Sequence, residues 1–331
     1  MLRNLIRGTL AVLSISCLGL AGHAGQSWAQ APATNAKPIS VVVPFSAGSA
    51  SDVVTRLLLD KVASQSGRNF VYLNRPAAGG NVGTQSVARA EPDGLTIGMS
   101  TSGPLAVNKI LNPELGYDPE KDLQPIGVFA VLPNVVVVSV TLPIDSLAQL
   151  IDHVRKTPDV GYGSVGNGSS QHLAGAFFEQ LVGARMTHVP YRVTGNLVTD
   201  LVSGRVPVSF QLLPNVLGSI QGGKVKPLVV ASKNRLAALP NVPTAAEAGL
   251  GAYESAAWFA LIAPRGLPRA YIDRLNADVA VALRDPSVRS RFSDLGAEPQ
   301  DPSPEEMSRL MAADIAKWTE IIRKGGITLE K

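Results

Sequence analysis

The chain has 331 residues, of which 45% are hydrophobic and 17% charged, a composition that excludes a disordered polypeptide. Lys and Arg number 30 against 26 Asp and Glu, and no cluster of them forms the basic stripe that binds nucleic acid. The single cysteine, Cys17, excludes a disulfide framework and a metal site built from several cysteines.

The first 29 residues have the pattern of a secretory signal peptide. Arg3 and Arg7 precede an apolar run at 10–20 that is too short to cross a membrane. Small residues at the −3 and −1 positions predict cleavage after Ala29, which leaves an exported chain of 302 residues with 28 basic and 26 acidic side chains. A buried N-terminal helix and a lipoprotein anchor at Cys17 are the alternatives.

Strands and helices alternate from the start of the remaining chain. The apolar run Ile39–Pro44 is typical of a strand buried on both faces. Ser49 and Asp52 form the N-terminal signature of a helix, which keeps its apolar spacing until Gly67. This alternation predicts an α/β fold with a parallel sheet and helices on both faces. The next elements are strands at Phe70–Asn74 and Leu95–Ser100, a Gly-rich turn at 79–83 and an intervening helix.

The same alternation continues in a second unit that begins near Asn134. Its first strand is Val135–Val140, and a Gly/Ser-rich turn at Gly161–Ser170 opens a further helix. Ser303 and Pro304 mark the start of the last helix as its cap and first residue. The other elements are helices at Ile144–Lys156 and at Leu197–Ser203, the latter capped by Thr194, and strands at Val206–Leu212, Val225–Ser232 and Ala256–Ala263.

The turn at Gly161–Ser170 begins with a literal G-x-G-x-x-G that ends at Gly166. A dinucleotide site also needs a strong strand before this motif and an acidic residue about 20 positions later, at the end of a second strand. The preceding Thr157–Val160 makes a poor strand, and Glu179 falls inside a helix. We therefore interpret the segment as a loop whose N–H groups and hydroxyls face an anion, with a purely structural capped turn as the alternative.

No set of side chains forms a catalytic or metal site in the sequence. Ser164 lacks the G-x-S-x-G setting of a nucleophile because Tyr162 stands in the first glycine position. Asp52 could act as a general base, but the third position of a helix favours capping. We predict no enzyme, no metal and no cofactor. The histidines after the leader are isolated and give no metal spacing: His153, His172 and His188.

Glycine and hydroxyl residues recur where predicted strands give way to helices. In an open α/β sheet such turns lie at the carboxyl ends of strands, where ligands bind. Helix N-termini there offer N–H donors and a positive partial charge that suit a carboxylate. Two such lobes facing each other predict a hinged binding protein for a small anion. The turns are Ser46–Ser49, Gly79–Gly83, Thr101–Gly103 and Ser164–Ser170.

Several segments in a fixed order carry a resemblance to a known family. They are Val43-Pro-Phe-Ser-Ala-Gly-Ser-Ala-Ser-Asp52, Arg75-Pro-Ala-Ala-Gly-Gly-Asn-Val-Gly83, residues 161–173, His188-Val-Pro-Tyr-Arg192, residues 241–249, Trp258 and Trp318. At these residues the chain resembles the Bug family, the periplasmic substrate-binding proteins of tripartite tricarboxylate transporters. The resemblance implies a type II periplasmic-binding-protein fold, with two α/β lobes joined by crossing strands and a ligand cleft between them.

The resemblance also implies which residues hold the ligand. The first turn is expected to hold one carboxylate through N–H groups and ordered water, with residues Ser46, Ala47, Gly48 and Ser49. The same lobe is expected to contribute Asn81, Thr101 and Ser102. The other lobe is expected to contribute Ser164, Asn167, Ser169, Ser170 and Gln211.

Three departures from the family pattern bear on the ligand. Ala47 and Ser49 replace the Pro and the second Gly of the usual Pro-Phe-x-Pro-Gly-Gly, and Val193 stands where a small residue is usual. Gln211 replaces a common acidic residue, which removes a partner for a ligand ammonium or hydroxyl group. A plain dicarboxylate is therefore expected in preference to an amino acid, with an aromatic acid as the other choice.

The resemblance implies a periplasmic monomer that captures a di- or tricarboxylate or an aromatic acid and delivers it to the membrane permease subunits of a tripartite tricarboxylate transporter. We predict a signal peptide at 1–29, a first lobe from 30–133 and 258–331, and a second lobe from 134–257. A sensory module that presents a carboxylate to a membrane receptor kinase is the alternative, since its cleft is the same. An exported hydrolase using Ser164 or Ser169 is the enzyme alternative.

Overall fold

The computed structural model of the protein describes residues 37–325 and residue 327. The described residues belong to a single compact unit, Ala36–Lys331. The predicted signal peptide at 1–29, with Cys17 and the cleavage site after Ala29, lies outside the described residues. These expectations therefore stay predictions.

Ten strands of the described residues form one sheet, in the order β2-β1-β3-β9-β4-β7-β5-β6, with β8 and β10 also paired to β4. β1 (Ile39–Val43) lies between β2 (Phe70–Asn74) and β3 (Thr96–Thr101), and the three strands are parallel. β1 is almost wholly apolar because helices cover both of its faces, and its valines are buried. β9 (Ala256–Pro264) runs antiparallel to β3.

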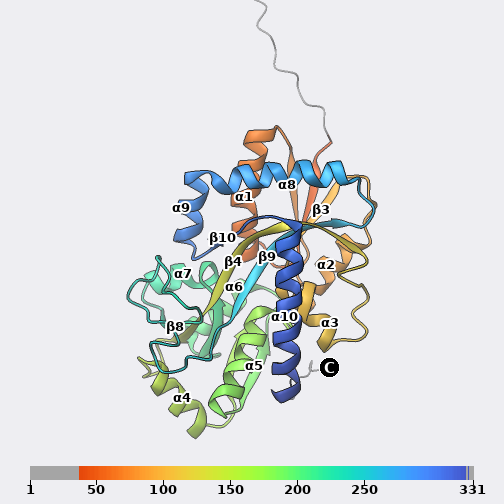
Figure 1. Cartoon of the computed structure of the whole chain (residues 1–331). Coiled ribbons are helices and arrows are strands. Elements are labelled where there is room, and N and C mark those ends of the chain that lie inside the picture. Colours follow the sequence, from red (N-terminus) through yellow and green to blue (C-terminus); the bar gives the residue numbers. More distant parts are fainter. Residues whose placement is uncertain (1–36, 326, 328–331) are drawn as a thin grey trace, which may run out of the picture. The chain divides into compact units, whose positions relative to one another are not determined.

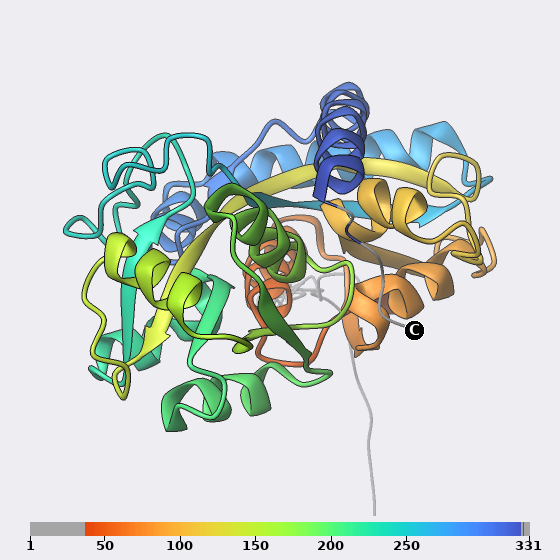
Figure 2. The same cartoon turned by 90° about the horizontal axis from the view of Figure 1, so that it is seen from below.

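The long strand β4 (Leu123–Ser139) extends from one part of the sheet into the other (Figure 2). Its residues up to Pro133 pair with β9, and its residues from Asn134 pair with other strands. We call β1–β3, β9, β10 and the first part of β4 the first half of the sheet. The second half consists of β5–β8 and the end of β4. The second half contains β5 (Val160–Ser164), β6 (Met186–Pro190), β7 (Val208–Leu212) and β8 (Val225–Val230), while β10 (Glu298–Pro299) pairs with the first part of β4.

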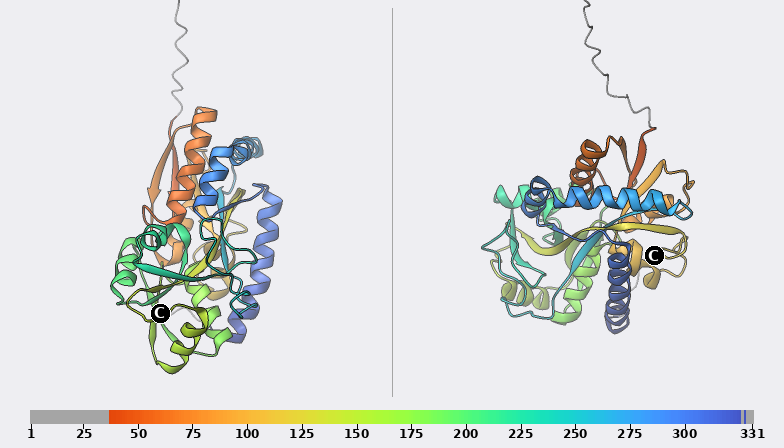
Figure 3. Two further views of the ribbon diagram at one scale, coloured as in Figure 1. Left: turned by 90° about the vertical axis from the view of Figure 1, so that its left-hand side faces the viewer. Right: turned by 45° about the horizontal axis from the view of Figure 1, so that its top comes forward.

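Helices cover both faces of this sheet (Figure 1). In the first half, α1 packs against α8, and α10 lies across β4 and β9. The red and orange elements gather with the blue helices α8 and α9 at one end, and the green elements lie at the other (Figure 3). The helices are α1 (Ala50–Ser66), α2 (Asn81–Ala88), α3 (Asn108–Leu111), α4 (Leu147–Lys156), α5 (Ser170–Val182), α6 (Thr194–Ser203), α7 (Leu213–Gln221), α8 (Arg269–Arg284), α9 (Pro286–Asp294) and α10 (Pro304–Gly325), with a 3-10 turn at Ala78–Gly80 and a π-helical turn at Gly103–Val107.

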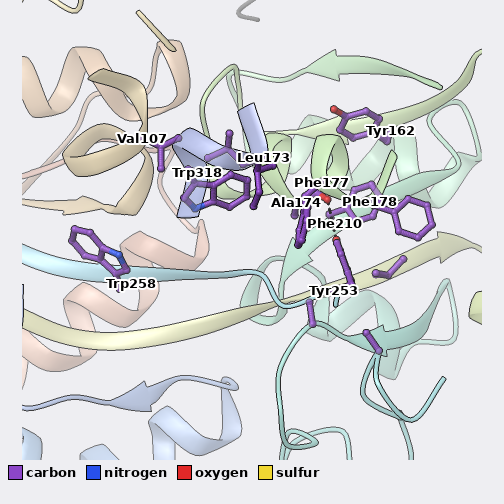
Figure 4. Packing of buried hydrophobic residues seen from close by; sticks show 14 of the residues in the cluster. Val107, Tyr162, Leu173, Ala174, Phe177, Phe178, Phe210, Tyr253, Trp258 and Trp318 are labelled. Carbon is purple, nitrogen blue, oxygen red and sulfur yellow. Dashed lines mark hydrogen bonds between the residues drawn. The ribbon is translucent and has the colours of Figure 1, made fainter. Parts of the chain in front are cut away.

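Aromatic side chains fill the core where α5 and α10 meet the second half of the sheet (Figure 4). The Phe178 ring lies 5.3 Å from Phe210 on β7, and Phe177 lies 6.2 Å from Trp318 on α10. The buried Tyr253 hydroxyl donates a hydrogen bond to the Ala174 carbonyl at 3.0 Å. This packing holds α5 in a fixed position on the sheet.

The structure confirms the predicted α/β class and most of the predicted elements. The predicted parallel sheet is wrong, because β4 and β9 run antiparallel to their neighbours and make the sheet mixed. Three elements also differ from the prediction. The segment 160–164 is the strand β5 rather than part of a turn, because it pairs in parallel with β6 and β7. β4 begins at Leu123, well before the predicted Val135. Thr194 is the first residue of α6, not its cap, because its N–H is bonded to Ser46 from the other half of the sheet.

The predicted N-terminus of α10 is confirmed, since the Ser303 hydroxyl accepts a hydrogen bond from the Glu306 N–H at 3.1 Å. Within 37–325 and 327, no helix is both long enough and apolar enough to cross a membrane.

Candidate ligand-binding site

A small cavity of about 20 Å³ lies at the carboxyl ends of strands β1, β3, β5 and β7. This volume has room for about one water molecule. Residues from both halves of the sheet line the cavity, and none of these lining side chains is ionisable. They are Phe45, Ser49, Ala50, Ser51, Thr101 and Phe259 from the first half, and Val165, Ser170, Gln171, Leu212 and Asn215 from the second.

One wall of the cavity is the N-terminus of α1. Gly48 has a φ of +75°, which turns the chain sharply after β1, and Ser49 follows as the helix cap. The Ser49 Oγ accepts a hydrogen bond from the Asp52 N–H at 3.4 Å, while the Gly48 N–H donates to the Asp52 carboxylate at 2.9 Å. The two bonds fix the turn, so that the first turn of α1 faces the cavity.

The opposite wall is the N-terminus of α5, and it repeats this geometry. Gly168 has a φ of +77°, and Ser169 is the cap, with nearly the same backbone angles as Ser49. The Ser169 Oγ accepts from the His172 N–H at 3.4 Å, and the Gly168 N–H donates to His172 Nδ1 at 3.1 Å. His172 thus has the role in this turn that Asp52 has in the first.

Two helix N-termini therefore open onto the same cavity. The first N–H groups of an α-helix have no partner within the helix, and the helix dipole adds roughly half a positive charge there. Such an end binds a carboxylate or phosphate without any basic side chain. The cavity lining also includes the apolar side chains of Phe45, Phe259, Val165 and Leu212. The arrangement suits a molecule with an anionic group at each end and an apolar middle.

A chain of hydrogen bonds joins the α1 wall to the second half of the sheet. Asn215 on α7 accepts from the Ala50 N–H at 2.7 Å and donates to Gln211 at 2.8 Å. Gln211 in turn donates to Ser209 at 2.8 Å, and the Ser209 hydroxyl donates to the Gly163 carbonyl at 2.6 Å. The chain fixes the Asn215 amide against the first residue of α1.

The structure brings three of the expected site residues, Ser49, Thr101 and Ser170, into the cavity lining. Five others lie in the turns before α1 and α5 or on β7. Ser46 donates to the Thr194 hydroxyl at 3.0 Å, Ser169 caps α5, Gln211 supports Asn215, and Gly48 holds the first turn with the exposed Ala47 beside it.

The remaining expected residues lie elsewhere. Asn81 and Asn167 line a separate groove of about 450 Å³, together with Arg192. Ser102 is buried at the start of the π-helical turn, and Ser164 contacts His188. Sequence patterns missed Ser51, Gln171 and Asn215, because each lies inside a helix and no local motif distinguishes it. The position of Asn215 three residues after the end of the strand β7 is the one available signal.

Ser164 and His188 form a short contact that resembles part of a catalytic triad. The Ser164 Oγ lies 2.6 Å from His188 Nε2, but Ser164 is fully buried. The His188 Nδ1 atom has no hydrogen-bond partner among the described residues, so no acid orients the ring. Burial, with the stacked His172 ring 4.2 Å away, lowers the pKa of His188 to about 3. His172 and His188 are thus stacked on each other rather than isolated as the sequence suggested.

No group of three or more His, Cys, Asp or Glu side chains within 37–325 and 327 could hold a metal ion. The site's chemistry, as far as the described chain defines it, consists of helix N-termini, hydroxyls and amides.

Comparison with known proteins shows what this architecture belongs to. The family model described as "Tripartite tricarboxylate transporter family receptor" (TctC) matches residues 54–327. The chain belongs to this family. TctC proteins are periplasmic solute-binding proteins, so this chain is a solute-binding protein rather than an enzyme, and the resemblance to the Bug family is confirmed.

Individual relatives cover nearly the whole chain. Protein BugT of Bordetella pertussis (strain Tohama I) is 34% identical over 297 residues, which are 89% of this chain and 91% of BugT. The solved structure of R. palustris Rpa4515 with adipate is 35% identical, has a TM-score of 0.86 and covers 89% of this chain and 99% of that one. MatC (Rpa3494) from Rhodopseudomonas palustris with bound malate is 32% identical, with a TM-score of 0.82 over 87% of this chain and 99% of that one. These structures confirm the periplasmic-binding-protein fold.

Proposed function

We propose that this TctC protein captures an aliphatic dicarboxylate between the N-termini of α1 and α5 and delivers it to a tripartite transporter. The observation that carries the proposal is the pair of serine-capped helix N-termini on one cavity without an ionisable lining residue. An ammonium group on the ligand would find no carboxylate partner among these residues, which disfavours an amino acid. The adipate and malate in the related structures are dicarboxylates of this class.

The same proposal includes export through the predicted leader and a division into lobes 30–133 with 258–331 and 134–257. The change of partner along β4 at Asn134 supports a boundary there. The cavity of about 20 Å³ is much smaller than a dicarboxylate, so its walls must separate to admit one. We propose that the two lobes move apart at this boundary to do so.

Isothermal titration calorimetry against adipate, malate, succinate, benzoate and aspartate tests the ligand class. We expect adipate, malate and succinate, which carry no ammonium group, to bind. Such a ligand at a hundredfold excess over its dissociation constant should stabilise the protein by about 2.7 kcal/mol. Binding of aspartate or benzoate alone, or of no acid in the panel, would contradict the proposal.

Loss of labelled dicarboxylate uptake on deletion of the gene would support transport, while unchanged uptake would favour a sensory role.

Thr101→Val tests whether the ligand occupies this cavity. Thr101 lines the cavity, and valine has nearly the shape of threonine but lacks the hydroxyl. Because a hydrogen bond to a charged group contributes about 1.5–3 kcal/mol, we expect at least about tenfold weaker binding. The matched control is Thr199→Val on the exposed side of α6, which should bind as the wild type does.

A further inference from the structure

The side chain of Asn215 lies against the N-terminus of α1. Its Oδ1 atom accepts the Ala50 N–H at 2.7 Å, and Ala50 is the first residue of α1. This N–H is one of the donors that a helix cannot satisfy internally and that anions bind. Both residues line the cavity, so the contact lies within the proposed site.

The hydrogen-bond chain behind Asn215 determines which atom of the amide faces α1. The nitrogen of Asn215 donates to the oxygen of Gln211, and the nitrogen of Gln211 donates to Ser209. Ser209 passes its own hydrogen to the Gly163 carbonyl, which can only accept. Each member of the chain thus has its donor and acceptor assigned, and the oxygen of Asn215 is the atom directed at the helix. Gln211 and Ser209 are fully buried, which keeps this orientation.

We infer that Asn215 acts as an internal competitor for the ligand, holding the place of a carboxylate oxygen at α1 until a ligand displaces it. This inference rests on the proposed function. An amide oxygen is a weaker acceptor than a carboxylate, because hydrogen bonds to charged groups are roughly twice as strong as neutral ones. A carboxylate can therefore displace Asn215, whereas a neutral ligand replaces one neutral bond by another and gains little.

Two variants at this position and one control have different expected results. Asn215→Ala removes the competitor, and we expect the best-binding dicarboxylate to bind about fivefold more tightly, the worth of a typical hydrogen bond. Asn215→Asp places a fixed negative charge at the same N–H, and we expect at least about a hundredfold loss of affinity through repulsion of the ligand carboxylate. Gln221→Ala, at the exposed end of α7, is the control and should not change binding.

The melting temperature of the ligand-free protein gives a second measurement that does not depend on the ligand. We expect Asn215→Ala to melt about 2 °C below the wild type, since the Ala50 N–H loses its acceptor. Weaker or unchanged dicarboxylate binding by Asn215→Ala, wild-type binding by Asn215→Asp, or a wild-type melting temperature for Asn215→Ala would each overturn the inference. Failure of the wild type to bind any dicarboxylate would instead contradict the proposed function.

Discussion

Asp52 stabilises the turn between β1 and α1 through three hydrogen bonds to one carboxylate. The Gly48 N–H binds one oxygen, while Arg56 and Asn74 bind the other, each at 2.9 Å. Burial raises the pKa of Asp52, but these hydrogen bonds outweigh burial and hold the pKa below its usual value. A carboxylate with a lowered pKa makes a poor general base, so the structural role that the sequence favoured is the one observed.

Asp52→Ala should lower the free energy of unfolding by about 2–3 kcal/mol, because three donors around a buried position lose their acceptor together. Urea denaturation measures the change. The control is Asp273→Ala, which removes a similar Arg–Asp pair on the exposed surface of α8 and should leave stability nearly unchanged. Equal losses in the two variants would mean that the Asp52 contacts contribute no more than a surface ion pair.

The N-termini of α1 and α5 have the same pair of hydrogen bonds, made by different side chains at the third helical position. The sequence predicts only the pair at α1, because Ser49 and Asp52 fit a known capping pattern. His172 is not a usual residue at the third helical position, and it accepts the Gly168 N–H only when its ring is neutral. No local motif predicts a neutral ring, because its protonation depends on burial by residues far along the chain.

The α5 turn should make stability depend on pH. Burial lowers the pKa of His172 to about 4, from an ordinary value near 6.5 in the unfolded chain. Below pH 6.5 the unfolded state therefore binds more protons than the folded state. The stabilisation is fully present above about pH 6.5 and is lost as the pH falls toward 4, by an amount on the order of 3 kcal/mol.

His172→Gln keeps an acceptor for the Gly168 N–H but does not titrate. Thermal unfolding of this variant should show a shallower fall in stability than the wild type between pH 6.5 and 4. His153→Gln on α4 is the matched control and should retain the wild-type slope. If both variants keep that slope, His172 does not control the acid sensitivity.

At the scale of the whole molecule, the sequence predicted the architecture but not which side chains meet. Alternating strands and helices, together with the Gly/Ser turns, indicated an α/β binding protein, and the fold confirms it. The contacts between Ser46 and Thr194 and between Ala50 and Asn215 join residues about 150 or more positions apart. No local pattern encodes such pairs, because they depend on how the two halves of the sheet approach each other.

Glycines permit a close approach between these halves. A Cβ atom on Gly103 would lie 2.3 Å from the Gly168 carbonyl oxygen, so any side chain there would push the two loops apart. Gly103 does not have a positive φ, so Gly103→Ala should fold normally. We expect it to bind the dicarboxylate about 5- to 150-fold more weakly, which corresponds to a clash of about 1–3 kcal/mol. The matched control is Gly218→Ala on α7, where the added methyl group would meet no atom of another segment within 4 Å. Calorimetric titration of both variants, with urea denaturation to confirm folding, measures the effect. Unchanged affinity in Gly103→Ala would mean that these loops need not meet when the ligand is bound.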